Sequence, residues 1–134
     1  MATARKTANK KTENSRFEQF RDRALAIGVD NAETVSDDPY ILGADEGFEP
    51  KIELPKPALR ARMIAEDAIR RNDSLTVSKI IFGPYVDRIL GRLEEYERET
   101  GENADVILVG LIYDYFEHFY GKGAADSVFP NVSN

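Results

Sequence analysis

The sequence predicts an all-α fold: a small bundle of four to five helices with a disordered N-terminal arm, an acidic linker and a loose C-terminal tail. Apolar residues recur every three or four positions through residues 57–120, which is the period of a helix. Residues 105–120 are apolar on nearly every side, as in a buried helix. With 134 residues, the chain has room for one small domain. We expect a helical domain over residues 48–121, a flexible region before it (1–47) and a flexible tail after it (122–134).

The central helix of the bundle is predicted over residues 105–120, DVILVGLIYDYFEHFY. Its ends are marked, because Asn103 can cap the first free N–H groups and Gly121 can close the last turn. The helix is too short to cross a bilayer, and Asp114 and Glu117 make it too charged. It must therefore be covered by the chain itself or by a partner.

The first 27 residues contain a basic arm and one short helix. Residues 1–14 carry four basic side chains and no large apolar residue after Met1, so we expect a disordered tail, or else a basic arm for RNA or an acidic partner. Over residues 15–27 the spacing of apolar residues predicts a short amphipathic helix. Its apolar positions are Phe17, Phe20, Ala24 and Ile27.

Residues 29–49 hold seven acids and no Lys or Arg, which predicts a solvated acidic linker. Closely spaced acids can bind calcium, but these do not match the spacing of an EF-hand loop, so no metal site is predicted. From Phe48 the pattern alternates through Ile52 and Leu54, which indicates one short strand or extended segment. Pro50 would confine that strand to a sheet edge.

Three further helices are predicted over residues 57–71, 74–83 and 84–100, separated by Asp73-Ser74 and Gly83-Pro84. Ser74 is the expected cap of the second. The expected inward positions of the first are Leu59, Met63, Ile64, Ala68 and Ile69. Those of the second are Leu75, Val77, Ile80 and Ile81, and those of the third are Val86, Ile89, Leu90, Leu93 and Tyr96. Short loops between them favour antiparallel packing in a bundle.

Composition excludes several classes of function. The absence of Cys removes disulfides, thiol nucleophiles and thiolate metal sites, and the net charge of −6 argues against nucleic acid as the main ligand. No signal peptide or membrane span is predicted, so we expect a soluble cytoplasmic protein. His118 could form an acid–base pair with Asp114 or Glu117, but a His near a helix end more often interacts with free carbonyl groups. We predict no catalytic residues, no cofactor and no enzymatic activity.

Three segments carry a resemblance to a known family. They are FEPKIELPKP (residues 48–57), KIIFGPYVDRIL (79–90) and LIYDYFEHFYGKG (111–123). The sequences of these segments, and their order along the chain, resemble those of the tail assembly chaperones of long-tailed (siphovirus-type) phages that infect actinobacteria. The resemblance implies a protein, made just before the tape measure protein, that binds it in the host cytoplasm and keeps its long helical chain soluble. Major tail protein subunits would polymerise around that chain, and the chaperone would be absent from the mature virion.

The resemblance also implies a longer form made by programmed frameshifting. Gly121-Lys122 can be encoded by a slippery run, so we hypothesise that translation shifts there and that the long form has a different tail in place of residues 123–134. The alternative is an ordinary flexible end. The frameshifted long form would then be a further partner of the short one.

The expected client-binding surface lies on the outward side of the last helix. Its first candidates are Tyr113, Phe116 and Tyr120, bordered by Ile81, Phe82 and Tyr85. These residues could instead bury one another, or pair copies of the protein in a homo-oligomer. Two other classes of function stay open: an acidic regulatory protein that inhibits a host factor by mimicking nucleic acid, and a structural tail or connector protein.

Overall fold

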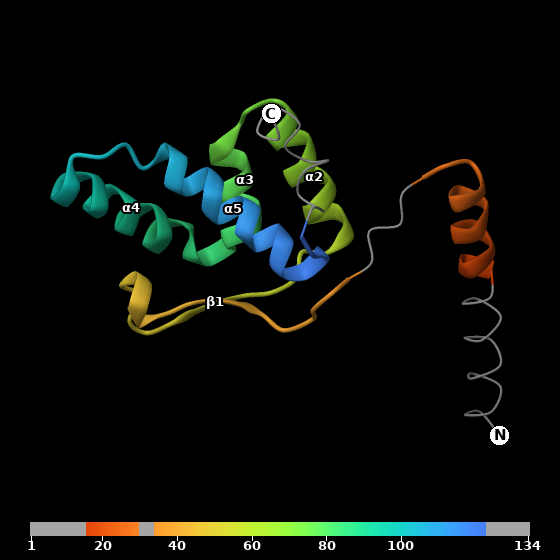
Figure 1. Ribbon diagram of the computed structural model, residues 1–134, viewed down its shortest axis with the longest axis horizontal. Coiled ribbons are helices and arrows are strands. Elements are labelled where there is room, and N and C mark those ends of the chain that lie inside the picture. The colour runs from red at the N-terminus through yellow and green to blue at the C-terminus, as the bar shows by residue number, and fades with distance from the viewer. Residues whose placement is uncertain (1–15, 30–33, 123–134) are drawn as a thin grey trace, which may run out of the picture. The chain divides into compact units, whose positions relative to one another are not determined.

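The computed structural model describes residues 16–29 and 34–122, and the chain divides into two compact units, Met1–Ala32 and Glu33–Asn134 (Figure 1). The described part of the first unit is a helix over residues 16–26, which confirms the short helix predicted there. The side chains of Phe17 and Phe20 in this helix, and of Ile27 directly after it, are exposed. The predicted arm (1–14) and most of the predicted tail (123–134) lie outside the described residues.

Within residues 34–122 of the second unit the structure has four α-helices and one small sheet, so the predicted all-α class is confirmed. The helices are α2 (Leu59–Arg70), α3 (Ser74–Phe82), α4 (Val86–Thr100) and α5 (Asp105–Tyr120). Short 3-10 turns, η1 (Ala44–Glu46) and η2 (Gly83–Tyr85), lie in the hairpin loop and before α4. Figure 1 shows α2 and α4 at opposite ends of this unit, with α3 and α5 between them.

A β-hairpin precedes the helices and differs from the predicted linker. Strand β1 (Tyr40–Leu42) pairs antiparallel with β2 (Ile52–Leu54), and Leu42 lies opposite Ile52. The side chains of Leu42, Ile52 and Leu54 are buried against the helices, whereas Ile41 points outward. The short strand predicted around Ile52 is therefore confirmed. Its partner was missed because it has only three residues inside an acid-rich stretch, too few to show a period of two.

Hydrogen bonds to α5 hold the segment before the hairpin. The backbone N–H of Val35 donates to the carbonyl of Phe119 at 2.6 Å, which satisfies one of the free acceptors at the end of the helix. Between the hairpin and α2, the Tyr115 hydroxyl donates to the carbonyl of Pro55 at 2.9 Å. The folded unit therefore includes described residues well before position 48, where the predicted domain begins.

The hydrophobic core joins the hairpin to one face of each of the helices α2, α3, α4 and α5. Its buried members are Leu42, Phe48, Ile52, Leu54, Ala65, Ala68, Ile69, Val77, Ile81, Phe82, Ile89, Ile112, Tyr115, Phe116 and Phe119. Helix α5 has the bounds predicted for the central helix. It contributes four of these side chains, three of them (Tyr115, Phe116 and Phe119) from its C-terminal half.

The inward face predicted for α2 is wrong in part. Its buried residues are Ala65, Ala68 and Ile69, while Leu59, Met63 and Ile64 are 65%, 60% and 40% exposed. Small alanine side chains allow close helix packing, but they are weak signals in a pattern that counts large apolar residues. In α3, likewise, Leu75 is exposed although it was expected to point inward.

Asp73, and not the expected Ser74, caps the start of α3. Its carboxylate accepts hydrogen bonds from the backbone N–H of Thr76 at 3.1 Å and from the Thr76 hydroxyl at 2.6 Å. These bonds favour the ionised form and lower the pKa of the Asp73 carboxyl below its usual value. The carbonyl of Ser74 instead accepts a hydrogen bond from the buried Ser78 hydroxyl at 2.8 Å.

Candidate functional site

The residues predicted to bind a client are not gathered on an open surface. Phe116 is only 2% exposed, so it does not lie on the outward side of α5 as expected. Ile81 and Phe82, expected to border that surface, are 5% and 1% exposed. Tyr85, Tyr113 and Tyr120 are half-buried and pack against the core. The structure does bring these six residues together, but they lie in or against the hydrophobic core.

Aromatic contacts explain why the C-terminal half of α5 is covered. The buried Tyr115 ring meets Phe116 and Phe119 edge to face, with ring centroids 5.4 and 5.1 Å apart. Burial raises the pKa of the Tyr115 hydroxyl above its usual value, because the phenolate would lose its hydration. On the half-buried side, the guanidinium of Arg62 lies over the Tyr120 ring, 5.4 Å from its centroid. These aromatic side chains largely bury one another, which is one of the alternatives drawn from the sequence.

Open apolar surface remains at the other end of α5. Val106 is 75% exposed and Ile107 is 37% exposed. Beside Ile107 lies a pocket of about 220 Å³ between the hairpin, α4 and α5, which we call the hairpin pocket. It is lined by Leu42, Glu46, Phe48, Ile89, Arg92, Leu93, Tyr96, Ile107 and Leu111.

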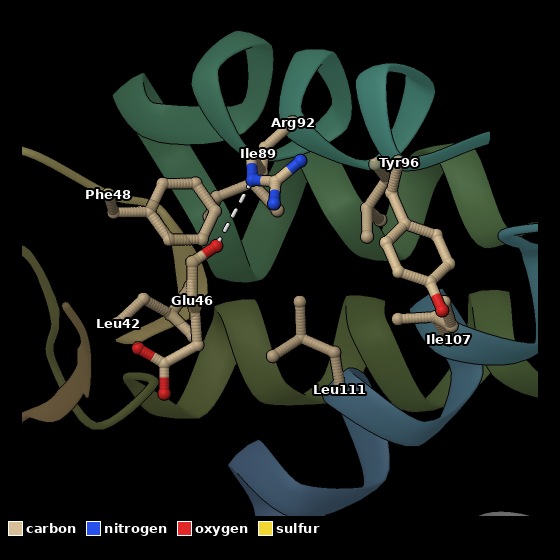
Figure 2. A pocket seen from close by; sticks show the side chains of 9 residues that line it. Leu42, Glu46, Phe48, Ile89, Arg92, Tyr96, Ile107 and Leu111 are labelled. Atoms are coloured by element: carbon tan, nitrogen blue, oxygen red, sulfur yellow. Dashed lines mark hydrogen bonds between the residues drawn. The ribbon is translucent and has the colours of Figure 1, made fainter. Parts of the chain in front are cut away.

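The walls of the hairpin pocket are mostly apolar. Figure 2 shows Leu42 and Phe48 on one side, Tyr96 and Ile107 on the other, and Leu111 pointing into the space between them. Pockets for small-molecule ligands usually measure roughly 300–1,000 Å³, so this one suits a protruding side chain of another polypeptide better than a cofactor. Its formation depends on the hairpin, whose first strand, β1, the sequence did not predict.

Arg92 and Gly47 fix the hairpin loop against α4. The Arg92 Nε–H donates to the carbonyl of Glu46 at 3.2 Å (Figure 2). Gly47 has a positive φ of 92°, and a Cβ there would collide with the Arg92 side chain. The Arg92 Nη1 atom is buried without a hydrogen-bond partner among the described residues, although the carboxylate of Glu99 lies 4.0 Å away. The pocket is therefore lined by three side chains with polar groups, Arg92, Glu46 and Tyr96, and by six apolar ones.

The elements that form the pocket are rich in acids. The hairpin, α4 and the chain from there to Leu111 carry eleven acids and four basic residues. The acids are Asp45, Glu46, Glu49, Glu53, Asp87, Glu94, Glu95, Glu97, Glu99, Glu102 and Asp105, and all but Glu97 are exposed. The basic residues are Lys51, Arg88, Arg92 and Arg98. An apolar ligand that also carries Lys or Arg would therefore be favoured here.

The residues considered for acid–base chemistry have structural partners. The Tyr40 hydroxyl donates to the Asp114 carboxylate at 2.6 Å, and the His118 Nε2–H donates to the carbonyl of Asp38 at 2.7 Å. Both bonds join α5 to the segment at the start of the hairpin. Among residues 16–29 and 34–122, no group of three or more His, Asp or Glu side chains is placed to hold a metal ion. In the same part of the chain, none of the helices has the length and apolar character needed to cross a membrane.

Gly121 and Lys122, the hypothesised frameshift point, lie directly after α5. Gly121 has a positive φ of 91° and its N–H donates to the carbonyl of Glu117 at 2.8 Å, so it ends the helix as expected. Both codons would thus fall just after α5. The frameshift itself stays a prediction, which the gene sequence tests.

Comparisons with protein families, curated proteins and solved structures found no match.

Proposed function

We propose that this protein is a phage tail assembly chaperone that binds the tape measure protein through the hairpin pocket. It keeps that long helical client soluble, helps recruit major tail protein subunits in the host cytoplasm, and leaves before the virion is complete. The observation that carries the proposal is an apolar pocket, open to solvent and surrounded by acids, at the exposed end of α5. The family resemblance supplies the identity of the client.

An apolar pocket supports this role because a chaperone must hold its client reversibly. Burying one Leu or Phe side chain contributes roughly 1.5–3 kcal/mol, so one or two anchors from a client helix give a contact that can be released. A helix places such anchors one turn apart, three or four residues along its sequence. Ile107 and Tyr96 on one wall and Phe48 on the other would hold those anchors.

The surrounding carboxylates support the same role. A long apolar client aggregates through its exposed surface, and negative charge on the bound chaperone keeps neighbouring complexes apart. The acids also favour client segments that carry Lys or Arg beside their apolar face. This moves the client contact from the C-terminal half of α5, where the sequence suggested it, to the N-terminal half.

Co-expression with the protein encoded immediately downstream tests the proposal. The full chain should keep most of that protein in the soluble fraction, whereas the variant Tyr96→Gln/Ile107→Gln should leave it insoluble. The matched control is Leu75→Gln, because Leu75 is also an exposed apolar residue but does not line the pocket. Circular dichroism and thermal unfolding show whether each variant still folds.

Two results would contradict the proposal. The downstream protein could stay insoluble with the wild-type chain, or the pocket variant could solubilise it as well as the control does. Recovery of the chain in purified virions would favour the structural tail or connector class instead. Binding of a host factor that falls steeply with salt would favour the acidic regulatory class, since apolar contacts persist when charges are screened.

A further inference from the structure

Helix α2 presents a second exposed apolar surface of opposite charge to the hairpin pocket. Leu59 and Met63 lie one turn apart, and Ile64, Arg60 and Arg70 extend the same exposed side of the helix. We call these five residues the α2 face. None of them lines the hairpin pocket, so the two surfaces are separate.

The charges of the two regions are complementary. Residues 55–85, which contain α2 and α3, carry six basic side chains and three acids. The elements around the hairpin pocket carry eleven acids and four basic side chains. The exposed Arg60 and Arg70 side chains give the α2 face a positive charge, whereas acids predominate in the elements that form the hairpin pocket. Such polarity favours contact between unlike ends of two copies and disfavours contact between like ends.

We propose that the hairpin pocket of one copy receives the α2 face of a second copy. Leu59 and Met63 would enter the pocket, and Arg60 and Arg70 would meet the carboxylates around it. Because α2 and α4 lie at opposite ends of the unit (Figure 1), the contact joins different surfaces of the two copies and leaves one of each free. A heterologous contact of this kind extends head to tail rather than stopping at a symmetric dimer.

The interaction is small. A pocket of about 220 Å³ and a face of five side chains place it below the roughly 1,200 Å² of buried surface typical of stable complexes. Self-association should therefore be reversible and grow with protein concentration. It should also weaken with added salt, because charge complementarity selects the pairing. The inference goes beyond the proposed function and does not depend on any client.

Sedimentation velocity of the full chain, over micromolar to millimolar concentrations, tests the proposal. The α2 variant, Leu59→Gln/Met63→Gln, and the pocket variant, Tyr96→Gln/Ile107→Gln, each keep all charges of the chain. Each alone should lower the association constant by about tenfold or more. An equimolar mixture should restore association as a 1:1 dimer and nothing larger, because the pocket variant keeps an intact α2 face and the α2 variant keeps an intact pocket.

Phe20→Gln is the control, since Phe20 is an exposed aromatic residue outside both surfaces. It should associate like the wild-type chain. The proposal is overturned if the wild-type chain stays monomeric to millimolar concentration, if the α2 variant associates normally, or if the mixture stays monomeric. It is equally overturned if Phe20→Gln abolishes association, because residues 16–26 would then form the contact. Circular dichroism of each variant confirms that loss of association is not loss of fold.

Discussion

Replacing Leu42 with Ala tests whether the hairpin is an integral part of the fold. Leu42 is 4% exposed and packs on the core, so the substitution removes three buried carbon atoms, worth about 2.4 kcal/mol at roughly 0.8 kcal/mol each. The added cavity term should be small, because Leu42 already borders the open hairpin pocket. We therefore expect a loss of about 2–3 kcal/mol, near the lower end for Leu→Ala. In a unit of this size that lowers the melting temperature by roughly 10–20 °C.

Urea unfolding followed by circular dichroism measures this loss, with Ile41→Ala as the matched control. Ile41 is on the same strand but 49% exposed, so its replacement should cost less than about 1 kcal/mol. The midpoint for Leu42→Ala should fall while the slope of the transition stays constant. A loss of about 0.5 kcal/mol or less, equal to that of the control, would mean that the segment behaves as the solvated linker expected from its acids.

Three further predictions follow from the core and the hairpin loop. Phe116→Ala should lower the free energy of unfolding in urea by about 3–5 kcal/mol, because the ring is buried. A loss below about 1 kcal/mol would mean that the ring is exposed. The free energy of unfolding should fall as pH rises above about 10, because the unfolded chain loses the Tyr115 proton there while the folded chain keeps it. Tyr115→Phe should make that decline shallower. An unchanged pH profile would refute the raised pKa of the Tyr115 hydroxyl. Gly47→Ala should destabilise the fold by more than about 1 kcal/mol in thermal unfolding, because Gly47 has a positive φ and an added Cβ would meet Arg92. Gly91→Ala, at an open position in α4, should stabilise the fold by about 0.5–1 kcal/mol. Equal effects of the two substitutions would contradict the geometry of the hairpin loop.

Strong helical periodicity made most elements predictable from the sequence. The central helix was predicted with the bounds of α5, because a long apolar run ends at Gly121, where the chain adopts a positive φ. The break at Gly83-Pro84 likewise separates α3 from α4. Where side chains were large and periodic, as at Ile89 in α4, the inward face was also correct.

The pairing of the strands and the orientation of α2 were harder to predict from the sequence. Strand β1 is defined by its partner Ile52–Leu54, and three residues carry too little pattern to reveal a strand on their own. The orientation of α2 depends on Ala65 and Ala68, whose small side chains are buried in the core. Their burial leaves Leu59 and Met63 exposed. Hydrophobicity alone would predict the opposite, with the larger Leu and Met side chains buried.

The position of the candidate site was half predictable. That α5 is only partly covered was expected from its apolar sides, and Val106 and Ile107 are indeed exposed. The aromatic residues led to the prediction that a client binds the C-terminal half of α5. Aromatic side chains, however, supply the largest buried area and so tend to occupy the core. Phe116 does so here. The open end is lined partly by Leu42, which lies in the strand β1 that the sequence did not predict, and by Phe48, which lies in the hairpin loop.

Methyl NMR of the full chain, titrated with synthetic peptides that span the downstream gene product, tests the central claim most directly. If the hairpin pocket holds the client, at least one apolar helical peptide should shift the methyl signals of Leu42, Leu93 and Ile107 together. Signals of Val77, which is buried in α3 and does not line the pocket, should stay in place. Shifts confined to methyl groups outside the pocket, or none with any peptide, would contradict the assignment of this surface.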